Sequence, residues 1–133
     1  MLLIDTNVQL GLTTNNRKWS HWSLAKLKEV STLGPLLIND VVHAELSVGF
    51  GRIEDLDRFL DDTRVDIAPT PRPALLQTAK TIRQYRKNGG NKTGVVTDFF
   101  VGAHAVVENL PLLTRGPRRY RTYFPMLMLI TPE

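Results

Sequence analysis

Three acidic residues stand apart from the other carboxylates of this sequence because each has apolar neighbours. Asp5 ends the apolar run 1–4, Asp98 is flanked by valines and phenylalanines, and Glu45 shares a helical stripe with valines four residues before it and three after it. Isolated carboxylates are rarely buried, because removing the charge from water is costly, and no basic residue lies near these three in sequence. A shared cation would explain all three, and oxygen ligands without histidine or cysteine select Mg²⁺ or Mn²⁺.

Each acid also has an ordinary structural interpretation. Asp5 and Asp98 precede segments with helical character, and aspartate is favoured as a helix N-cap. Glu45 falls in the middle of an expected helix, where it could be a hydrogen-bonded acid or one whose carboxylate reaches water. Ligand sites of open α/β sheets lie at the carboxyl ends of strands, where Asp5 is expected and where a helix start could bring Asp98 beside it. Both interpretations stay open on these observations.

Other groups that carry chemistry are less promising. The three histidines are isolated and lack metal-ligand spacing, so we expect surface or hydrogen-bonded roles for His21, His43 and His104. The absence of cysteine excludes disulfide scaffolds, thiol nucleophiles and cysteine-ligated metals, and it is typical of a cytoplasmic protein. Residues 87–94 (KNGGNKTG) lack the spacing of a phosphate-binding loop, so we interpret them as a flexible basic loop.

Positive charge is concentrated in the second half of the chain. Residues 80–121 contain nine basic residues against two acids, whereas residues 1–79 carry a net negative charge. Such a surface suits a phosphate backbone, although it could also be a solvated face. The basic residues expected to contact RNA are Arg115, Arg118, Arg119 and Arg121, with Arg83, Arg86 and Lys92 as a second group.

The elements that must position these residues alternate between strand and helix. The length of 133 residues suits one hydrophobic core, so residues 1–133 are expected to form a single domain. No apolar stretch is long enough for a membrane span, and residues 1–5 (MLLID) contain no basic leader, so we expect a protein that is neither exported nor inserted in a membrane. The alternation predicts an α/β sandwich with a parallel sheet. Strands are expected at 1–4, 35–38, 65–68, 110–114 and 126–130; helices at 19–30, 40–50, 53–60, 71–87 and 98–108; and a loop between 5 and 18.

Four segments, in order along the chain, resemble motifs of PIN domains. Residues 3–7 (LIDTN) look like the opening motif, 39–50 (NDVVHAELSVGF) like the segment with a glutamate, and 97–105 (TDFFVGAHA) like the segment with a third acid. Residues 112–125 (LLTRGPRRYRTYFP) resemble the tail of VapC-type toxins. Because four matches occur at separations typical of the family, the sequence is identified as a member over essentially its whole length.

This resemblance implies a fold, an activity and partners. The fold would be a three-layer α/β/α sandwich with a central, mostly parallel five-stranded sheet. The activity would be that of a metal-dependent endoribonuclease toxin, usually a homodimer, inhibited by a cognate VapB-type antitoxin. By position, Asp5 and Asp98 would contact Mg²⁺ or Mn²⁺ directly, and Glu45 would do so directly or through a water. The side chains expected to order these ligands are Thr6, Asn7 and Thr114.

One position departs from the family pattern. The pattern has a fourth acid shortly after the strand that ends near Thr114, and this sequence has Gly116. The ordinary interpretation is a turn glycine before Pro117. The functional interpretation is a weakened site, because one carboxylate fewer lowers the negative charge that would hold a second ion. We hypothesise a substitution selected or introduced to permit expression of a toxin; natural divergence is the alternative.

The intact type of site would hydrolyse RNA by in-line attack of an activated water, leaving a 5′-phosphate and a 3′-hydroxyl. Glu45 or Asp98 could accept the proton. Three aromatic residues of the tail are expected to belong to the core rather than to stack on bases: Tyr120, Tyr123 and Phe124.

Two other functions fit parts of the same pattern. A chain weakened at Gly116 could bind RNA or antitoxin while scarcely cutting, and dependence of cleavage on Asp5 would separate the two. A phosphotransfer domain with Asp5 as nucleophile is disfavoured, because such sites need a second nearby aspartate where this chain has Asn7.

Overall fold

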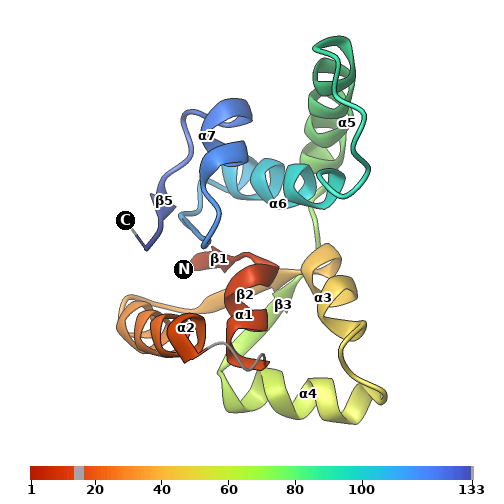
Figure 1. The fold of residues 1–133 in the computed structure, drawn as a ribbon. Helices are drawn as coiled ribbons and strands as arrows, with labels where there is room; N and C mark the ends of the chain where they lie inside the picture. Colours follow the sequence, from red (N-terminus) through yellow and green to blue (C-terminus); the bar gives the residue numbers. More distant parts are fainter. Residues whose placement is uncertain (14–16, 133) are drawn as a thin grey trace.

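A central parallel sheet organises the molecule. The computed structural model describes residues 1–13 and 17–132. All five strands are parallel, in the order β3-β2-β1-β4-β5. Helices α5, α6 and α7 lie above the sheet in Figure 1, and α1, α2 and α4 lie below it. The arrangement confirms the predicted α/β/α sandwich. The strands are β1 Leu2–Ile4, β2 Leu36–Asn39, β3 Val65–Ala68, β4 Leu112–Leu113 and β5 Leu129–Ile130.

The apolar runs at 1–4, 35–38 and 110–114 overlap the buried or mostly buried strands β1, β2 and β4, as a parallel sheet covered on both faces requires. β1 lies at the centre of the sheet, and all three of its residues are buried. Val65 begins β3, which lies at one edge of the sheet. The last two strands, β4 and β5, are shorter than the predicted runs.

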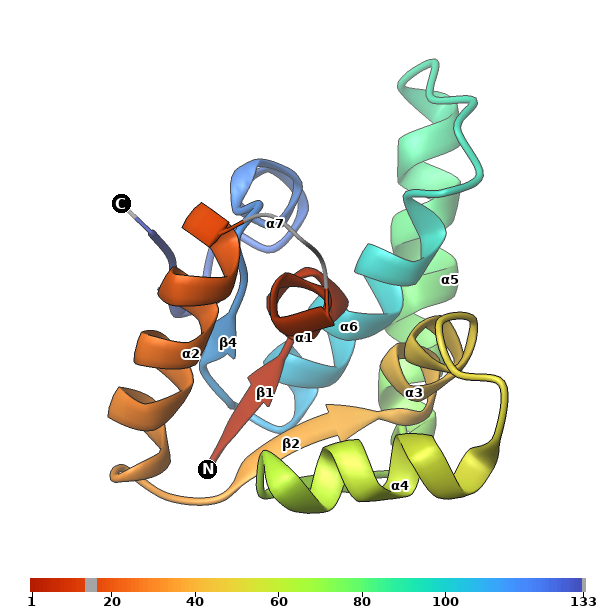
Figure 2. The same cartoon turned by 60° about the horizontal axis from the view of Figure 1, so that its bottom comes forward.

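Seven helices are assigned within the described residues, and two of them were not predicted. Their bounds are α1 Thr6–Thr13, α2 Arg17–Ser31, α3 Asp40–Ser47, α4 Ile53–Asp62, α5 Arg72–Lys87, α6 Val96–Val107 and α7 Arg118–Tyr123. The loop expected after residue 5 is wrong, since α1 begins at once and packs on α2 and α3. Figure 2 shows α1 in front of the sheet between α2 and α3. Tertiary packing there outweighs the low helix propensity of threonine and asparagine.

Helix starts matter most for the candidate site. Asn39 caps α3, since its side-chain oxygen accepts the backbone N–H of Val42 at 2.9 Å. α3 ends at Ser47, before the expected stop near residue 50. α6 begins at Val96, two residues before the predicted start at Asp98. Asp98 therefore lies inside the first turn of the helix and is not its N-cap.

The parallel arrangement brings several polar residues to one edge of the sheet. β1, β2 and β4 are neighbours, and their carboxyl ends lead into Asp5, Asp40 and Thr114. Ligand sites of open α/β sheets form at this edge. Within the described part of the chain, no helix is both long enough and apolar enough to cross a membrane.

Candidate active site

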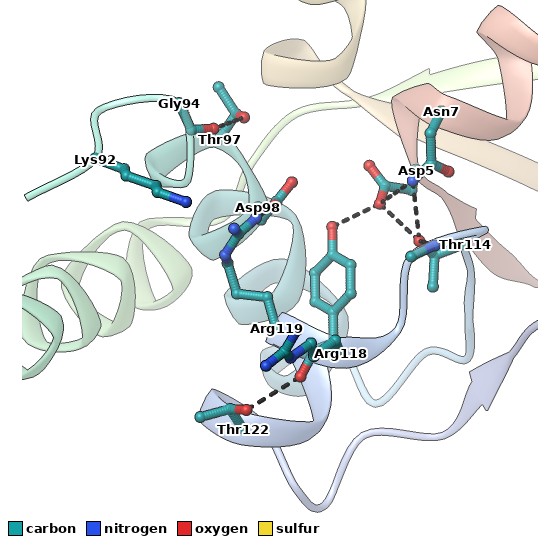
Figure 3. A network of polar contacts seen from close by, with 12 residues as sticks. Asp5, Asn7, Lys92, Gly94, Thr97, Asp98, Thr114, Arg118, Arg119 and Thr122 are labelled. Carbon is teal, nitrogen blue, oxygen red and sulfur yellow. Dashed lines mark hydrogen bonds and ion pairs between the residues drawn. The ribbon is translucent and has the colours of Figure 1, made fainter. Parts of the chain in front are cut away.

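Asp5 is the most enclosed acid of the sheet edge. It follows the central strand and has an exposed fraction of 4%. The backbone N–H of Thr6 donates to Oδ1 at 2.8 Å. The hydroxyls of Thr114 and Tyr120 both donate to Oδ2 at 2.8 Å, and the Asn7 amide lies at 3.4 Å from the same oxygen. Figure 3 shows the contacts that meet on this carboxylate. The bond from Thr6 resembles the capping interaction, but the hydroxyls of Thr114 and Tyr120 come from distant segments.

Asn7 and Thr114 join the start of α1 to the end of β4. The Asn7 side chain accepts the backbone N–H of Arg115 at 3.1 Å and donates to the Thr114 hydroxyl at 3.3 Å. The Thr114 oxygen also accepts the backbone N–H of Gly116 at 3.1 Å. These bonds fix the turn after β4 against Asp5. Thr6, Asn7 and Thr114 thus contact the acids they were expected to order.

Glu45 and Asp98 reach the same region from two helices. Glu45 is half-buried on α3, and its Oε1 accepts the hydroxyl of Thr6 at 2.6 Å. Asp98 is half-buried on α6 and forms an ion pair of 2.5 Å with Arg119 of α7. The N-cap of α6, Val95, makes no side-chain capping bond. The capping interpretation of Asp98 is therefore wrong.

The acids influence one another electrostatically. Burial raises the pKa of Asp5 to about 6; the charge of Asp98 adds to the rise, and hydrogen bonds from Tyr120, Thr114 and the Thr6 amide oppose it. Burial also raises the pKa of Asp98, opposed by Arg119 and assisted by the charge of Glu45. Such desolvated, mutually repelling carboxylates are typical of functional sites.

Two residues of α7 form hydrogen bonds with Asp5 and Asp98. Among the described residues, no three acidic or histidine side chains are arranged as metal ligands. Instead the Tyr120 hydroxyl binds Asp5, and the Arg119 guanidinium binds Asp98. The donor set still fits a hard divalent cation in its chemistry, because carboxylates are oxygen ligands, and because the charge of Asp98 raises the pKa of Asp5 while that of Glu45 raises the pKa of Asp98.

Gly116 is exposed beside this network. A Cβ built on it would lie 3.6 Å from the Asn7 amide nitrogen, which is an ordinary contact distance, and its φ is not in the positive region. Neither the space nor the backbone therefore demands glycine. A side chain at residue 116 can be accommodated next to Asn7.

The basic residues predicted to contact RNA lie in three different environments. Lys92, Arg118 and Arg119 line one hollow beside the acids. Arg115 stacks over the ring of Trp19, with 4.5 Å between the guanidinium carbon and the ring centre. The others are exposed on α5 and α7: Arg83, Arg86 and Arg121.

Sequence reasoning missed the polar role of α7. Tyr120 was expected in the core and is buried, yet its hydroxyl contacts Asp5 across 115 residues of sequence. Its burial and the charges of the acids raise its pKa well above the usual value, so it remains a hydrogen-bond donor. His104 is buried with its Nδ1 3.3 Å from the Asn39 side-chain amide, in keeping with its expected structural role.

Comparisons with known proteins agree with this geometry. The PIN domain profile matches residues 2–125. Among solved structures, VapBC2 of Rickettsia felis, solved with a promoter DNA fragment, is 19% identical with a TM-score of 0.75, covering 99% of this chain and 98% of that chain. VapBC-1 of nontypeable Haemophilus influenzae is 20% identical with a TM-score of 0.72, covering 98% and 96%. FitAcB of Neisseria gonorrhoeae is 19% identical with a TM-score of 0.65, covering 99% and 98%. No curated protein matches the sequence.

Proposed function

Because this chain belongs to the PIN-domain family, we propose that it is a VapC-type toxin and a metal-dependent endoribonuclease. The observation that carries the proposal is the meeting of Asp5, Glu45 and Asp98 at the carboxyl edge of the sheet. Burial and mutual repulsion raise the pKa values of two of these acids. A divalent cation would relieve that repulsion.

Asp5, Asp98 and Glu45 would hold Mg²⁺ or Mn²⁺. When bound, the ion lowers the pKa of a water and neutralises charge on the phosphate. The chain contributes a fixed orientation of Asp5, through Thr114, Tyr120 and the Thr6 amide. The Thr6 hydroxyl orients Glu45 in the same way. Glu45 is the candidate to accept the proton of the attacking water, because its carboxylate is half-buried and has no basic partner among the described residues.

Gly116 and Arg119 both lower the expected activity. Gly116 leaves out a carboxylate where the family pattern has one, and Arg119 competes with any cation for Asp98. These two features favour a second candidate function, a PIN protein that binds RNA or antitoxin and cuts weakly.

The proposed partner is a VapB-type antitoxin, supported by similarity in fold to chains from VapBC and FitAB complexes. We also propose that the chain forms a homodimer in the cytoplasm and cleaves RNA there.

The test is cleavage of total and synthetic RNA by the purified chain with Mn²⁺, with Mg²⁺ or with EDTA. We expect slow, metal-dependent cleavage that leaves a 5′-phosphate and is abolished by Asp5→Asn or Asp98→Asn. Asp66→Asn, an exposed acid on the edge strand β3, is the matched control and should cleave like the unaltered chain. Cleavage that persists in EDTA or in Asp5→Asn would reject the nuclease, and binding without any cleavage would favour the second candidate.

A further inference from the structure

A hollow beside the acids is lined by cations and phenol rings. Its volume is about 610 Å³, within the range of about 300–1,000 Å³ found for ligand pockets. Arg119, which pairs with Asp98, and Gly116 connect the hollow with the acids. Figure 3 shows Lys92, Arg118 and Thr122 around the Arg119–Asp98 pair. The other lining residues are Tyr85, Lys92, Arg118, Thr122 and Tyr123.

We propose that this hollow is a nucleotide subsite, which takes one unpaired nucleotide of an RNA strand beside the phosphate to be cut. This inference rests on the proposed function and adds which residues of this chain hold the substrate beside the cut. Lys92 and Arg118 bind phosphate oxygens, and the ring of Tyr123 contacts the base.

The loop after α5 packs against the ring of Tyr85. A Cβ on Gly90 would lie 2.3–2.5 Å from three ring atoms, so only glycine lets the backbone lie against this ring. The Tyr85 hydroxyl then accepts the backbone N–H of Lys92 at 3.2 Å. The segment that was expected to be a flexible loop is therefore held in place, and it brings the Lys92 ammonium to the hollow.

Tyr123 is held from behind by other rings. Its centre lies 5.1 Å from that of Phe99 and 6.0 Å from that of Tyr85, both in edge-to-face geometry. It is half-buried and lines the hollow, so part of the ring remains available to a ligand. An anchored aromatic ring beside cations is the arrangement that single-stranded nucleic acids use for stacking and phosphate contact.

An unpaired strand fits these features better than a duplex does. Bases within a helix are covered on both faces by their neighbours, whereas an unstacked base can reach an aromatic ring. An acidic peptide would use the cations alone and would gain nothing specific from the ring.

The experiment measures binding of the whole chain to a fluorescent single-stranded oligouridylate by fluorescence anisotropy. EDTA is present so that cleavage does not interfere, and the measurement is repeated over a series of salt concentrations. Lys92→Ala should weaken binding and reduce the slope of log K against log salt by about 0.7, the value for one phosphate contact on a single strand. Tyr123→Leu should weaken binding by about 5- to 150-fold, the loss of one stacked base, at an unchanged slope. Tyr123→Phe keeps the ring and should retain the affinity.

Arg58→Ala is the matched control, because Arg58 is an exposed cation on α4, far from α7 in both views of the fold (Figures 1 and 2). Circular dichroism checks that Tyr123→Leu is folded. Lys92 lies on an exposed loop, so Lys92→Ala tests the subsite even if Tyr123→Leu does not fold. Binding by the unaltered chain that neither variant changes would reject the subsite and leave the nuclease standing. Equal affinity for a duplex of the same length would also reject it. Absence of both RNA binding and cleavage would reject the proposed function itself.

Discussion

Replacing Gly116 by aspartate should restore a strong metal site at the sheet edge. The Gly116 amide and the Asp5 carboxylate share the Thr114 hydroxyl at 3.1 Å and 2.8 Å, so a carboxylate at 116 can lie within about 6 Å of Asp5. Two charges at that distance interact by roughly 3 kcal/mol at an effective dielectric constant of about 20. Because residue 116 is exposed, solvent and salt screen this repulsion, and we expect a repulsion energy of about 1–2 kcal/mol.

Without metal, this repulsion should lower the stability of Gly116→Asp, with a melting temperature lower by about 3–8 °C. With Mn²⁺ the sign reverses, because a divalent cation is attracted to the added charge, and the dissociation constant should fall at least tenfold, which corresponds to about 1.4 kcal/mol. RNA cleavage should increase by a similar or larger factor. The assays are calorimetric titration with Mn²⁺, thermal unfolding with and without Mn²⁺, and cleavage rates.

Gly116→Asn is the matched control, since it fills the same space beside Asn7 without adding charge. If Gly116→Asp and Gly116→Asn bind Mn²⁺ with equal affinity, the fourth-acid reasoning is wrong. Equal cleavage rates for Gly116→Asp and the unaltered chain would show that Gly116 does not weaken the site.

Three further predictions concern the side chains around the acids. The pKa of Asp5 is raised from 3.8 to about 6, so its contribution to stability is present below pH 4 and is lost as pH rises to 6; Asp5→Asn should remove up to about 3 kcal/mol of that pH dependence in urea unfolding. Asn39→Ala should cost about 1–2 kcal/mol of unfolding free energy through loss of the α3 cap, whereas an unchanged denaturation midpoint would contradict the capping role. Arg119→Gln should tighten Mn²⁺ binding, as measured by titration, because a competing cation leaves Asp98; weaker binding would show that Arg119 instead supports the site.

Sequence reasoning succeeded where the pattern of apolar residues is clear and where an acidic residue interrupts it. Apolar runs predicted the buried strands, and the acids interrupting apolar segments singled out Asp5 and Asp98, which the fold brings into electrostatic contact. It failed for α1 and α7, whose short helices depend on packing against distant elements more than on local propensity. The hydroxyl bond from Tyr120 to Asp5 could not be predicted for the same reason, since 115 residues separate the two.

The central position of β1 has a consequence for the synthesis of the protein. Asp5 is among the first residues made, but its hydrogen-bond donors Thr114 and Tyr120 follow it by 109 and 115 residues. β1 pairs with β4, so its place in the sheet is complete only when residues 112–113 can join it. A chain still emerging from the ribosome therefore lacks the arranged acids. Whatever chemistry they perform can therefore begin only after nearly the whole chain has been released.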